Sequence, residues 1–187
     1  MIKPWRILAE RQVYNGLPFV EVSVETVELP DGRVIDDYHH IKAGTFVTII
    51  PETRDGRIIM LRQYRHGVRR IGLALPGGRI DGGEAPEAAA RRELLEELGA
   101  SATSWRALSS WGTSCTYGFT TSHYFHAAGV ERVQAPASDD LEEAEQVKLT
   151  RAEARAALTN GSIVSLGHAA PLAFFLLEET AAASTRE

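Results

Sequence analysis

Three glutamates, Glu93, Glu96 and Glu97, are the residues of this sequence best suited by type and spacing to do chemistry. At about 100° per residue, they share an arc about 100° wide on a helix predicted over residues 87–98. The opposing arc holds three leucines, which are Leu94, Leu95 and Leu98. We therefore expect the leucine face to be buried and the carboxylates to point together to the other side.

This arrangement of charge is unfavourable by itself. Glu93 and Glu97 are like charges four residues apart, which costs ~0.2–0.5 kcal/mol. All three glutamates also lie in the C-terminal half of the helix, where the helix dipole favours cations. Two explanations remain open at this point. The cluster is either a solvated acidic face or a site for a hard cation such as Mg²⁺, which takes carboxylate oxygens together with substrate phosphate oxygens.

The glutamates belong to a longer pattern that begins at Gly78. Five residues separate Gly78 from Glu84, and seven more separate Glu84 from the run Arg92-Glu93-Leu94-Leu95-Glu96-Glu97-Leu98-Gly99-Ala100. This segment resembles the Nudix box, and every fixed position matches at the right spacing. Average residue frequencies would produce seven such matches in about one in a million chains of this size. Ala100 is a weak version of the final apolar position.

The resemblance implies roles for these residues. In Nudix hydrolases the glutamates matching Glu93, Glu96 and Glu97 bind divalent metal, usually Mg²⁺, with Mn²⁺ as the alternative. The carbonyl of Gly77 often completes the metal site. Arg92 and Glu84 orient the loop and the glutamates, so the catalytic set implied on the helix is Glu96, Glu97 and Arg92. Metal ions suit this chemistry because they neutralise a diphosphate, lower the pKa of the attacking water and hold the leaving oxygen.

The remaining sequence predicts the elements that position the helix. Pro86 suits its first position and Gly99 the residue past its end. Alternating apolar and polar residues predict a half-buried strand over residues 20–27 that pairs with 34–41. Apolar runs with turn and cap signals predict the other elements, which are strands at 45–50, 58–61, 73–75, 105–111, 123–128 and 147–149 and helices at 151–158 and 167–179.

The family resemblance implies an α/β fold, a Nudix-type α/β/α sandwich around a mixed sheet with an N-terminal antiparallel β extension. We predict three regions: the β extension over residues 1–43, a Nudix hydrolase domain over 44–180 and a flexible tail over 181–187. The extension and the segment 61–65 resemble the ADP-ribose and nucleoside-diphosphate-sugar pyrophosphatases. In that branch the N-terminal sheet helps form a homodimer and reaches into the partner's site.

The same branch implies further site residues. The arginine matching Arg65 contacts substrate, and Gly78, Trp5, His39 and Tyr117 are further candidates for substrate binding. Trp5 has a competing explanation, because an N-terminal tryptophan also packs at interfaces.

A second acidic segment precedes the predicted strand at 147–149. In this branch such a segment carries a general base and a metal ligand, which we align with Glu143 and Glu145. The alternative is a charged loop, because residues 139–145 contain five acids and some acid would match in any register.

The sequence differs from the ADP-ribose group at three places that concern substrate recognition. The Ser-Pro-Gly that marks the ADP-ribose group is Thr116-Tyr117-Gly118 here, the following glutamate is Ser122, and the strand that offers Arg and Glu across the dimer is residues 38–42. The resemblance thus implies an enzyme, a metal-dependent hydrolase of a nucleoside diphosphate sugar, with ADP-ribose cleaved to AMP and ribose 5-phosphate as the leading candidate. The alternatives are another nucleotide sugar such as GDP-mannose, or a non-catalytic nucleotide-binding module.

Composition limits the partners. The net charge is −5 and no dense basic run is present, so we expect a small-molecule nucleotide substrate and no nucleic acid. Cys115 is the single cysteine, which excludes an intrachain disulfide and fits a reducing cytoplasm. The longest apolar stretch, residues 169–177, is about half a membrane span, so no membrane association is expected.

Overall fold

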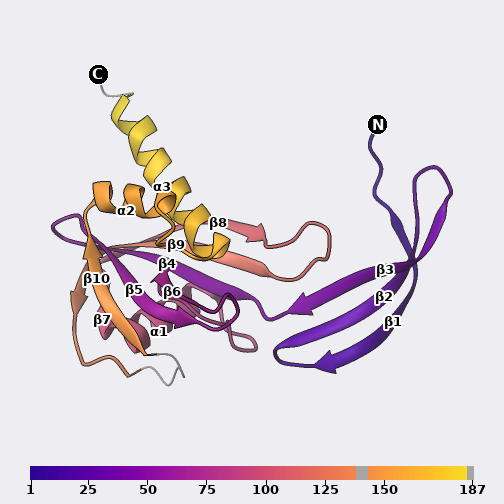
Figure 1. Cartoon of the computed structure of the whole chain (residues 1–187), viewed down its shortest axis with the longest axis horizontal. Coiled ribbons are helices and arrows are strands. Elements are labelled where there is room, and N and C mark those ends of the chain that lie inside the picture. The colour runs from indigo at the N-terminus through magenta and orange to yellow at the C-terminus, as the bar shows by residue number, and fades with distance from the viewer. Residues whose placement is uncertain (138–142, 185–187) are drawn as a thin grey trace. The chain divides into compact units, whose positions relative to one another are not determined.

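The computed structural model describes residues 1–137 and 143–184 of the chain (Figure 1). The chain divides into two compact units. The first contains Met1–Thr45 together with Trp111–Thr121, and the second contains Phe46–Ser110 and the chain from Ser122 onward.

The first unit is built on a three-stranded antiparallel sheet in the order β1-β2-β3. Its strands are β1 (Arg6–Gly16), β2 (Val20–Glu28) and β3 (Val34–Ala43). The two strands predicted here are confirmed, and β1 adds a third on the other side of β2. Gly32 has a φ of +86°, which a residue without Cβ adopts readily in the turn between β2 and β3.

In the middle of β2 the polar residues are buried more deeply than the apolar residues beside them, which is the reverse of what an alternating strand usually shows. Ser23 and Glu25 are buried, at 3% and 7% exposed, whereas Val22 and Val24 are only half-buried. The register explains this, because long side chains on both neighbouring strands flank the polar positions. Those cross-strand neighbours are Glu10 and Gln12 on β1 and Tyr38 and His40 on β3.

The segment Trp111–Thr121 belongs to this unit because its backbone pairs with β3. The amides of Ile41 and Ala43 donate to the carbonyls of Tyr117 and Phe119 at 2.8 and 2.7 Å. On the same strand, the Tyr38 hydroxyl donates to the Thr116 carbonyl. A region distant in sequence is therefore hydrogen-bonded to the edge strand of the N-terminal sheet.

The second unit is an α/β sandwich around a mixed sheet. The main strand order is β10-β5-β4-β9-β7, with β6 paired to β5, β8 paired to β9, and β4 parallel to β9. Its strands are β4 (Phe46–Thr53), β5 (Ile58–Arg65), β6 (Arg70–Ala74), β7 (Ala100–Ser101), β8 (Ser104–Gly112), β9 (Thr121–Arg132) and β10 (Ala144–Leu149). Its helices are α1 (Pro86–Leu98), α2 (Arg151–Thr159) and α3 (Leu166–Ser184).

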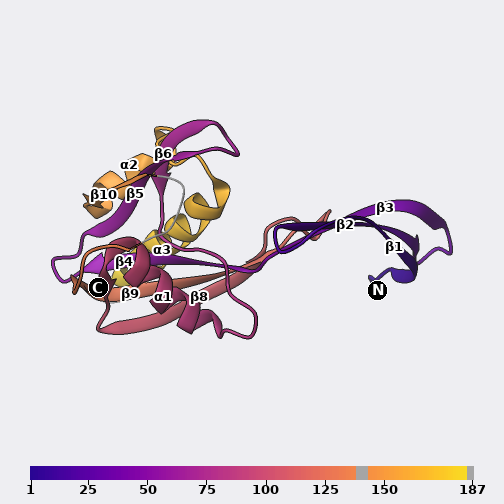
Figure 2. The ribbon, with the colours of Figure 1, turned by 90° about the horizontal axis from the view of Figure 1, so that it is seen from below.

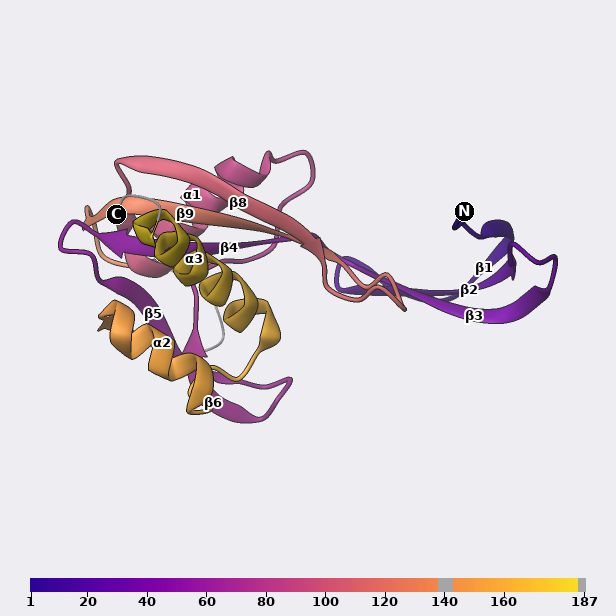
Figure 3. The same cartoon turned by 90° about the horizontal axis from the view of Figure 1, so that it is seen from above.

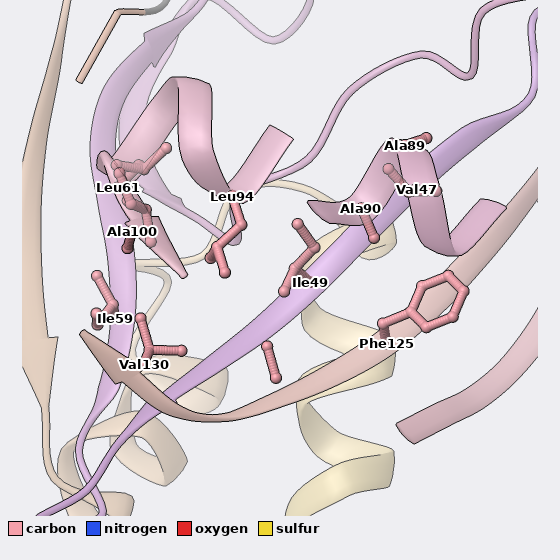
Figure 4. Packing of buried hydrophobic residues seen from close by; sticks show 12 residues of the cluster. Val47, Ile49, Ile59, Leu61, Ala89, Ala90, Leu94, Ala100, Phe125 and Val130 are labelled. Carbon is pink, nitrogen blue, oxygen red and sulfur yellow. The ribbon is translucent and has the colours of Figure 1, made fainter. Parts of the chain in front are cut away.

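Two hydrophobic clusters identify the layers. Alternate residues of β4 separate between them, with Ile49 packing in the cluster that contains α1 and Ile50 in the cluster that contains α2 and α3. Figure 4 shows Ala89, Ala90 and Leu94 of α1 next to β4 and its neighbours. Helices therefore cover both faces of the sheet, as expected for the sandwich, and Figures 2 and 3 show them from two further sides.

Local signals set the helix ends. Pro86 opens α1, and Gly99 closes it with a left-handed φ of +62°. Thr150 and Glu153 form a reciprocal capping box at the start of α2. The helix predicted to end at residue 179 continues to Ser184, and the last residues of the predicted tail, 185–187, lie outside the described part. In the described chain, no helix has both the length and the apolar character to cross a membrane.

Candidate active site

The glycine-rich turn before α1 is fixed against the central strand. The amides of Val47 and Ile49 on β4 donate to the carbonyls of Gly78 and Pro76 at 2.9 and 2.8 Å. Gly77 has a φ of +147°, and a Cβ there would lie 2.2 Å from the Val47 carbonyl oxygen. This backbone path therefore requires glycine at position 77.

Two of the three helix glutamates lie against this turn. The Gly77 amide donates to Glu97 Oε2 at 2.7 Å. A Cβ at Gly78 would lie 2.4 Å from Glu93 Oε1, so the absence of a side chain there leaves room for that carboxylate. The turn and the third and fourth helical turns of α1 thus form one cluster of oxygen-bearing groups.

Arg92 organises the carboxylates. Its Nη1 donates to Glu93 Oε1 at 2.7 Å and to Glu96 Oε2 at 2.9 Å. Its Nε and Nη2 donate to the two oxygens of Glu84, and Nη2 also donates to the Arg79 carbonyl. The hydrogen bond from Arg92 lowers the pKa of Glu84, and the carboxylates, Glu84 above all, raise the pKa of Arg92. Arg92 and Glu84 are thus arranged to orient the loop and the helix glutamates.

One detail of the predicted helix face is wrong. Glu93 is buried, at 9% exposed, whereas Leu95 is 36% exposed. Glu93 lies at the border of the leucine arc, where Gly78 and Arg92 cover it and Arg92 compensates its charge. At the edges of the leucine arc, the neighbouring parts of the chain decide whether a side chain is buried, and the helical period alone does not.

Strand β10 joins the C-terminal end of α1. Gln146 Nε2 donates to the carbonyls of Leu98 and Glu97 at 3.3 and 3.4 Å. Next to it, Glu145 pairs with Arg62 of β5 at 3.2 Å, and Glu143 is exposed just before the strand. Of the acidic run at 139–145, residues 139–142 lie outside the described part.

The predicted substrate-binding residues fall in both units. Arg65 ends β5 and lies opposite Arg70 in the β5–β6 hairpin of the second unit. Gly78 lies in the turn before α1, also in the second unit. The other three residues are exposed in the first unit, and they are Trp5, His39 and Tyr117. Trp5 packs the edge of its ring against Tyr38, with 5.6 Å between ring centroids.

His168, which lies next to the strand that leads into the Gly77 turn, was not identified from the sequence. Its Nδ1 accepts a hydrogen bond of 3.3 Å from the Leu75 amide, two residues before Gly77. Burial, with a smaller contribution from the charge of Arg65, lowers the pKa of His168 to about 4, so the ring is neutral at pH 7. An isolated histidine at the start of an apolar helix gives no pattern that sequence analysis could use.

The donor set fits a hard divalent cation. The side chains that Glu93, Glu96 and Glu97 contribute from α1 are carboxylates, and oxygen atoms are the ligands that Mg²⁺ prefers. The Arg92 guanidinium already provides positive charge between Glu93 and Glu96. Because Gly78 has no side chain, the carboxylate oxygens of the buried Glu93 lie directly against the turn.

Comparison with known families agrees with this fold and box. A family model described as NUDIX domain matches residues 42–166, and one described as nucleoside diphosphate sugar hydrolase N-terminal domain matches residues 5–41. The chain therefore belongs to the Nudix family, whose hydrolases generally use a divalent metal.

Several proteins of known activity are similar to this chain in sequence. An ADP-ribose pyrophosphatase of Bacillus subtilis is 32% identical over 122 residues, which are 65% of this chain and 65% of that protein. A CMP-5'-(N-acetyl-N-hydroxy-3-aminopropyl)phosphonate hydrolase of Streptomyces rubellomurinus is 30% identical over 88% of this chain and 79% of its own. A methanol dehydrogenase activator of Bacillus methanolicus is 29% identical over 80% of both chains.

A solved structure titled as an ADP compounds hydrolase has the same fold. The two structures superpose with a TM-score of 0.83 at 24% sequence identity, and the superposition covers 100% of this chain and 99% of the other chain. The likeness includes the N-terminal sheet as well as the sandwich, which confirms the predicted fold class.

Proposed function

We propose that this protein hydrolyses the diphosphate bond of a nucleoside diphosphate sugar, with ADP-ribose the leading substrate. The observation that carries the proposal is the contact of Glu93 and Glu97 with the Gly77-Gly78 turn, because it assembles oxygen donors where a diphosphate and its cation can meet. The relatives that hydrolyse ADP-ribose and a CMP-linked phosphonate support the same class of bond cleavage.

In the proposed reaction, a water oxygen attacks one phosphorus, the bridging P–O bond breaks, and the bridging oxygen leaves with the other phosphate. The residues that would hold Mg²⁺ are Glu93, Glu96, Glu97, Glu145 and the carbonyl of Gly77. A bound Mg²⁺ supplies neutralisation of the diphosphate charge and a lower pKa for the attacking water. Glu143, which is exposed at the start of β10, is our candidate to accept the proton of that water.

Each unit contains candidate residues for substrate recognition. Arg65 faces an anionic substrate with support from Arg70, its neighbour in the hairpin. In the first unit, Trp5, His39 and Tyr117 each have an exposed ring, and they are our candidates to contact the base or the sugar. Because Tyr117 and Ser122 depart from the ADP-ribose pattern, another nucleotide sugar such as GDP-mannose is the second candidate.

Homodimerisation is part of the proposal. The first unit leaves large apolar side chains exposed on β1 and the turn after it, including Ile7, Tyr14 and Phe19 at 59%, 56% and 77% exposed. Apolar surface of this kind is typical of an interface between subunits. Light scattering of the purified chain should give twice the monomer mass, and Phe19→Asp should lower it. A monomeric wild-type protein would contradict the dimer.

A substrate panel tests the activity. The protein is incubated with Mg²⁺, or Mn²⁺, and ADP-ribose, ADP-glucose, GDP-mannose, UDP-glucose, NADH or a diadenosine polyphosphate, and a coupled phosphatase detects the monophosphate products. We expect release from ADP-ribose to exceed the rest. Preference for another nucleotide sugar would transfer the assignment to that substrate, and silence with every compound and both ions would favour a nucleotide-binding module.

A further inference from the structure

We propose that Glu10, Glu25 and His40 form a binding site for a divalent transition-metal ion, best matched by Zn²⁺, on the N-terminal sheet. One residue comes from each of the three strands β1, β2 and β3. Their ligand atoms all lie within 4.8 Å of one another. Among the described residues, this group is the one that brings three metal-ligating side chains this close together, and it shares no residue with α1.

The register of the sheet creates the cluster. Glu10 is the direct cross-strand partner of Glu25. His40 pairs with Ser23, two residues before Glu25 on the same strand, so His40 lies diagonally across from the Glu25 side chain on the same face. The three donors therefore converge through backbone pairing.

Charge at this position calls for a cation. Like charges directly opposite each other in an antiparallel pair are destabilising, and a buried carboxylate adds a desolvation cost. The Glu25 side chain is 9% exposed, and its Oε1 lies 4.0 Å from His40 Nδ1, farther than a hydrogen bond. An ion between Glu10, Glu25 and His40 offsets both costs at once.

The histidine is held in a suitable orientation. A Cβ at Gly118 would lie 2.2 Å from His40 Nε2, so the backbone of the Trp111–Thr121 segment packs directly against that side of the ring. The opposite nitrogen, Nδ1, is the atom nearest Glu25 Oε1. Gly118 thus leaves one imidazole nitrogen directed toward the carboxylates.

The donor set selects the ion. Mg²⁺ and Ca²⁺ take oxygen ligands, whereas an imidazole with two carboxylates suits Zn²⁺ and related transition metals. Tetrahedral donors about 2.1 Å from zinc are about 3.4 Å apart, so binding requires the three side chains, whose ligand atoms lie within 4.8 Å of one another, to move closer together around the ion. Water or a ligand would supply the fourth position.

Equilibrium dialysis of the tag-free full chain against Zn²⁺, in buffer containing excess Mg²⁺, tests the site. Bound zinc is measured by elemental analysis. We expect about one Zn²⁺ per chain and at least about tenfold weaker binding in Glu10→Gln, Glu25→Gln and His40→Gln. Zinc should also raise the melting temperature of the wild type and not that of His40→Gln.

Matched control variants test whether zinc binds at this site and not at other residues of the chain. His39→Gln changes the exposed neighbour of His40 on the same strand and should retain zinc, as should Glu97→Gln on α1. Because Glu10 is exposed, Glu10→Gln is a test that does not depend on substituting a buried residue. Absence of zinc from the wild type, retention by both Glu10→Gln and His40→Gln, or loss in Glu97→Gln would overturn the proposal.

Discussion

Gly77 donates its amide to Glu97 Oε2 at 2.7 Å and thereby ties the turn before the helix to the helix's most C-terminal glutamate. Gly78, the next residue of the turn, extends the relationship to Glu93, one helical turn before Glu97, because the absence of a side chain at Gly78 leaves the space that the Glu93 carboxylate occupies. The positions of these glutamates are therefore set by the backbone of a loop as well as by the helix, and substitutions in that loop should affect activity.

Gly78→Ala should lower turnover without unfolding the protein. The added Cβ would meet the end of the Glu93 side chain, which can swing away, so the stability cost is small while the carboxylate is displaced. Misplacing a positioned group by about 1 Å costs on the order of 100-fold in rate. Steady-state kinetics and thermal melts measure the two effects. Gly82→Ala is the matched control because a Cβ there meets nothing within 4 Å. Equal activity of the two variants would refute the proposed role of this space.

Arg92→Met should destabilise the fold at neutral pH. Removal of the guanidinium takes away the 2.7 Å ion pair of the buried Glu93 carboxylate, a loss of about 2 kcal/mol in the free energy of unfolding. Urea denaturation measures the change. Arg91→Met, which removes an exposed pair with Glu87 on the same helix, should cost far less.

The Arg92 effect should depend on pH in a defined direction. Arg92 lowers the pKa of Glu84 in the folded state below its ordinary value of 4.5, so the stability from this pair is present above that value. It is lost as the pH falls through the lowered pKa. The difference in stability between wild type and Arg92→Met should therefore shrink in acid. A difference that grows below pH 4.5 would contradict the assignment.

His168 should make the protein less stable between pH 6.5 and about 4. The unfolded state protonates the ring near pH 6.5, whereas the buried ring stays neutral down to about 4, so the unfolded state binds more protons in this interval. The loss reaches up to about 3 kcal/mol. His168→Gln should flatten this part of the stability curve, measured by urea denaturation at successive pH values. The exposed His66→Gln is the control, and a curve unchanged by His168→Gln would count against the burial effect.

The sequence predicts α1, its two ends and the identity of its carboxylates, because the helical period, Pro86 and Gly99 are local signals. The family resemblance, and not the local pattern, predicts the sandwich around a mixed sheet, and the order of the strands in that sheet was not predicted. Local signals do not predict that Glu93 is buried and Leu95 exposed, since Gly78 and Arg92 decide this from elsewhere in the chain. The burial of Glu25 and the pairing of Tyr117 with β3 likewise depend on tertiary register.

We propose that the α1 glutamates support Mg²⁺-dependent cleavage of a nucleotide sugar. The most direct measurement is the rate of AMP release from ADP-ribose by wild type, Glu97→Gln and Glu87→Gln, each with and without Mg²⁺. Glu87 is an exposed glutamate in the first turn of the same helix and serves as the control. We predict Mg²⁺-dependent release by wild type and Glu87→Gln, and a loss of at least about 100-fold in Glu97→Gln, because even residues that only support a metal ligand cost about 10- to 100-fold when changed. Glu97→Gln turning over ADP-ribose as fast as wild type would contradict the account.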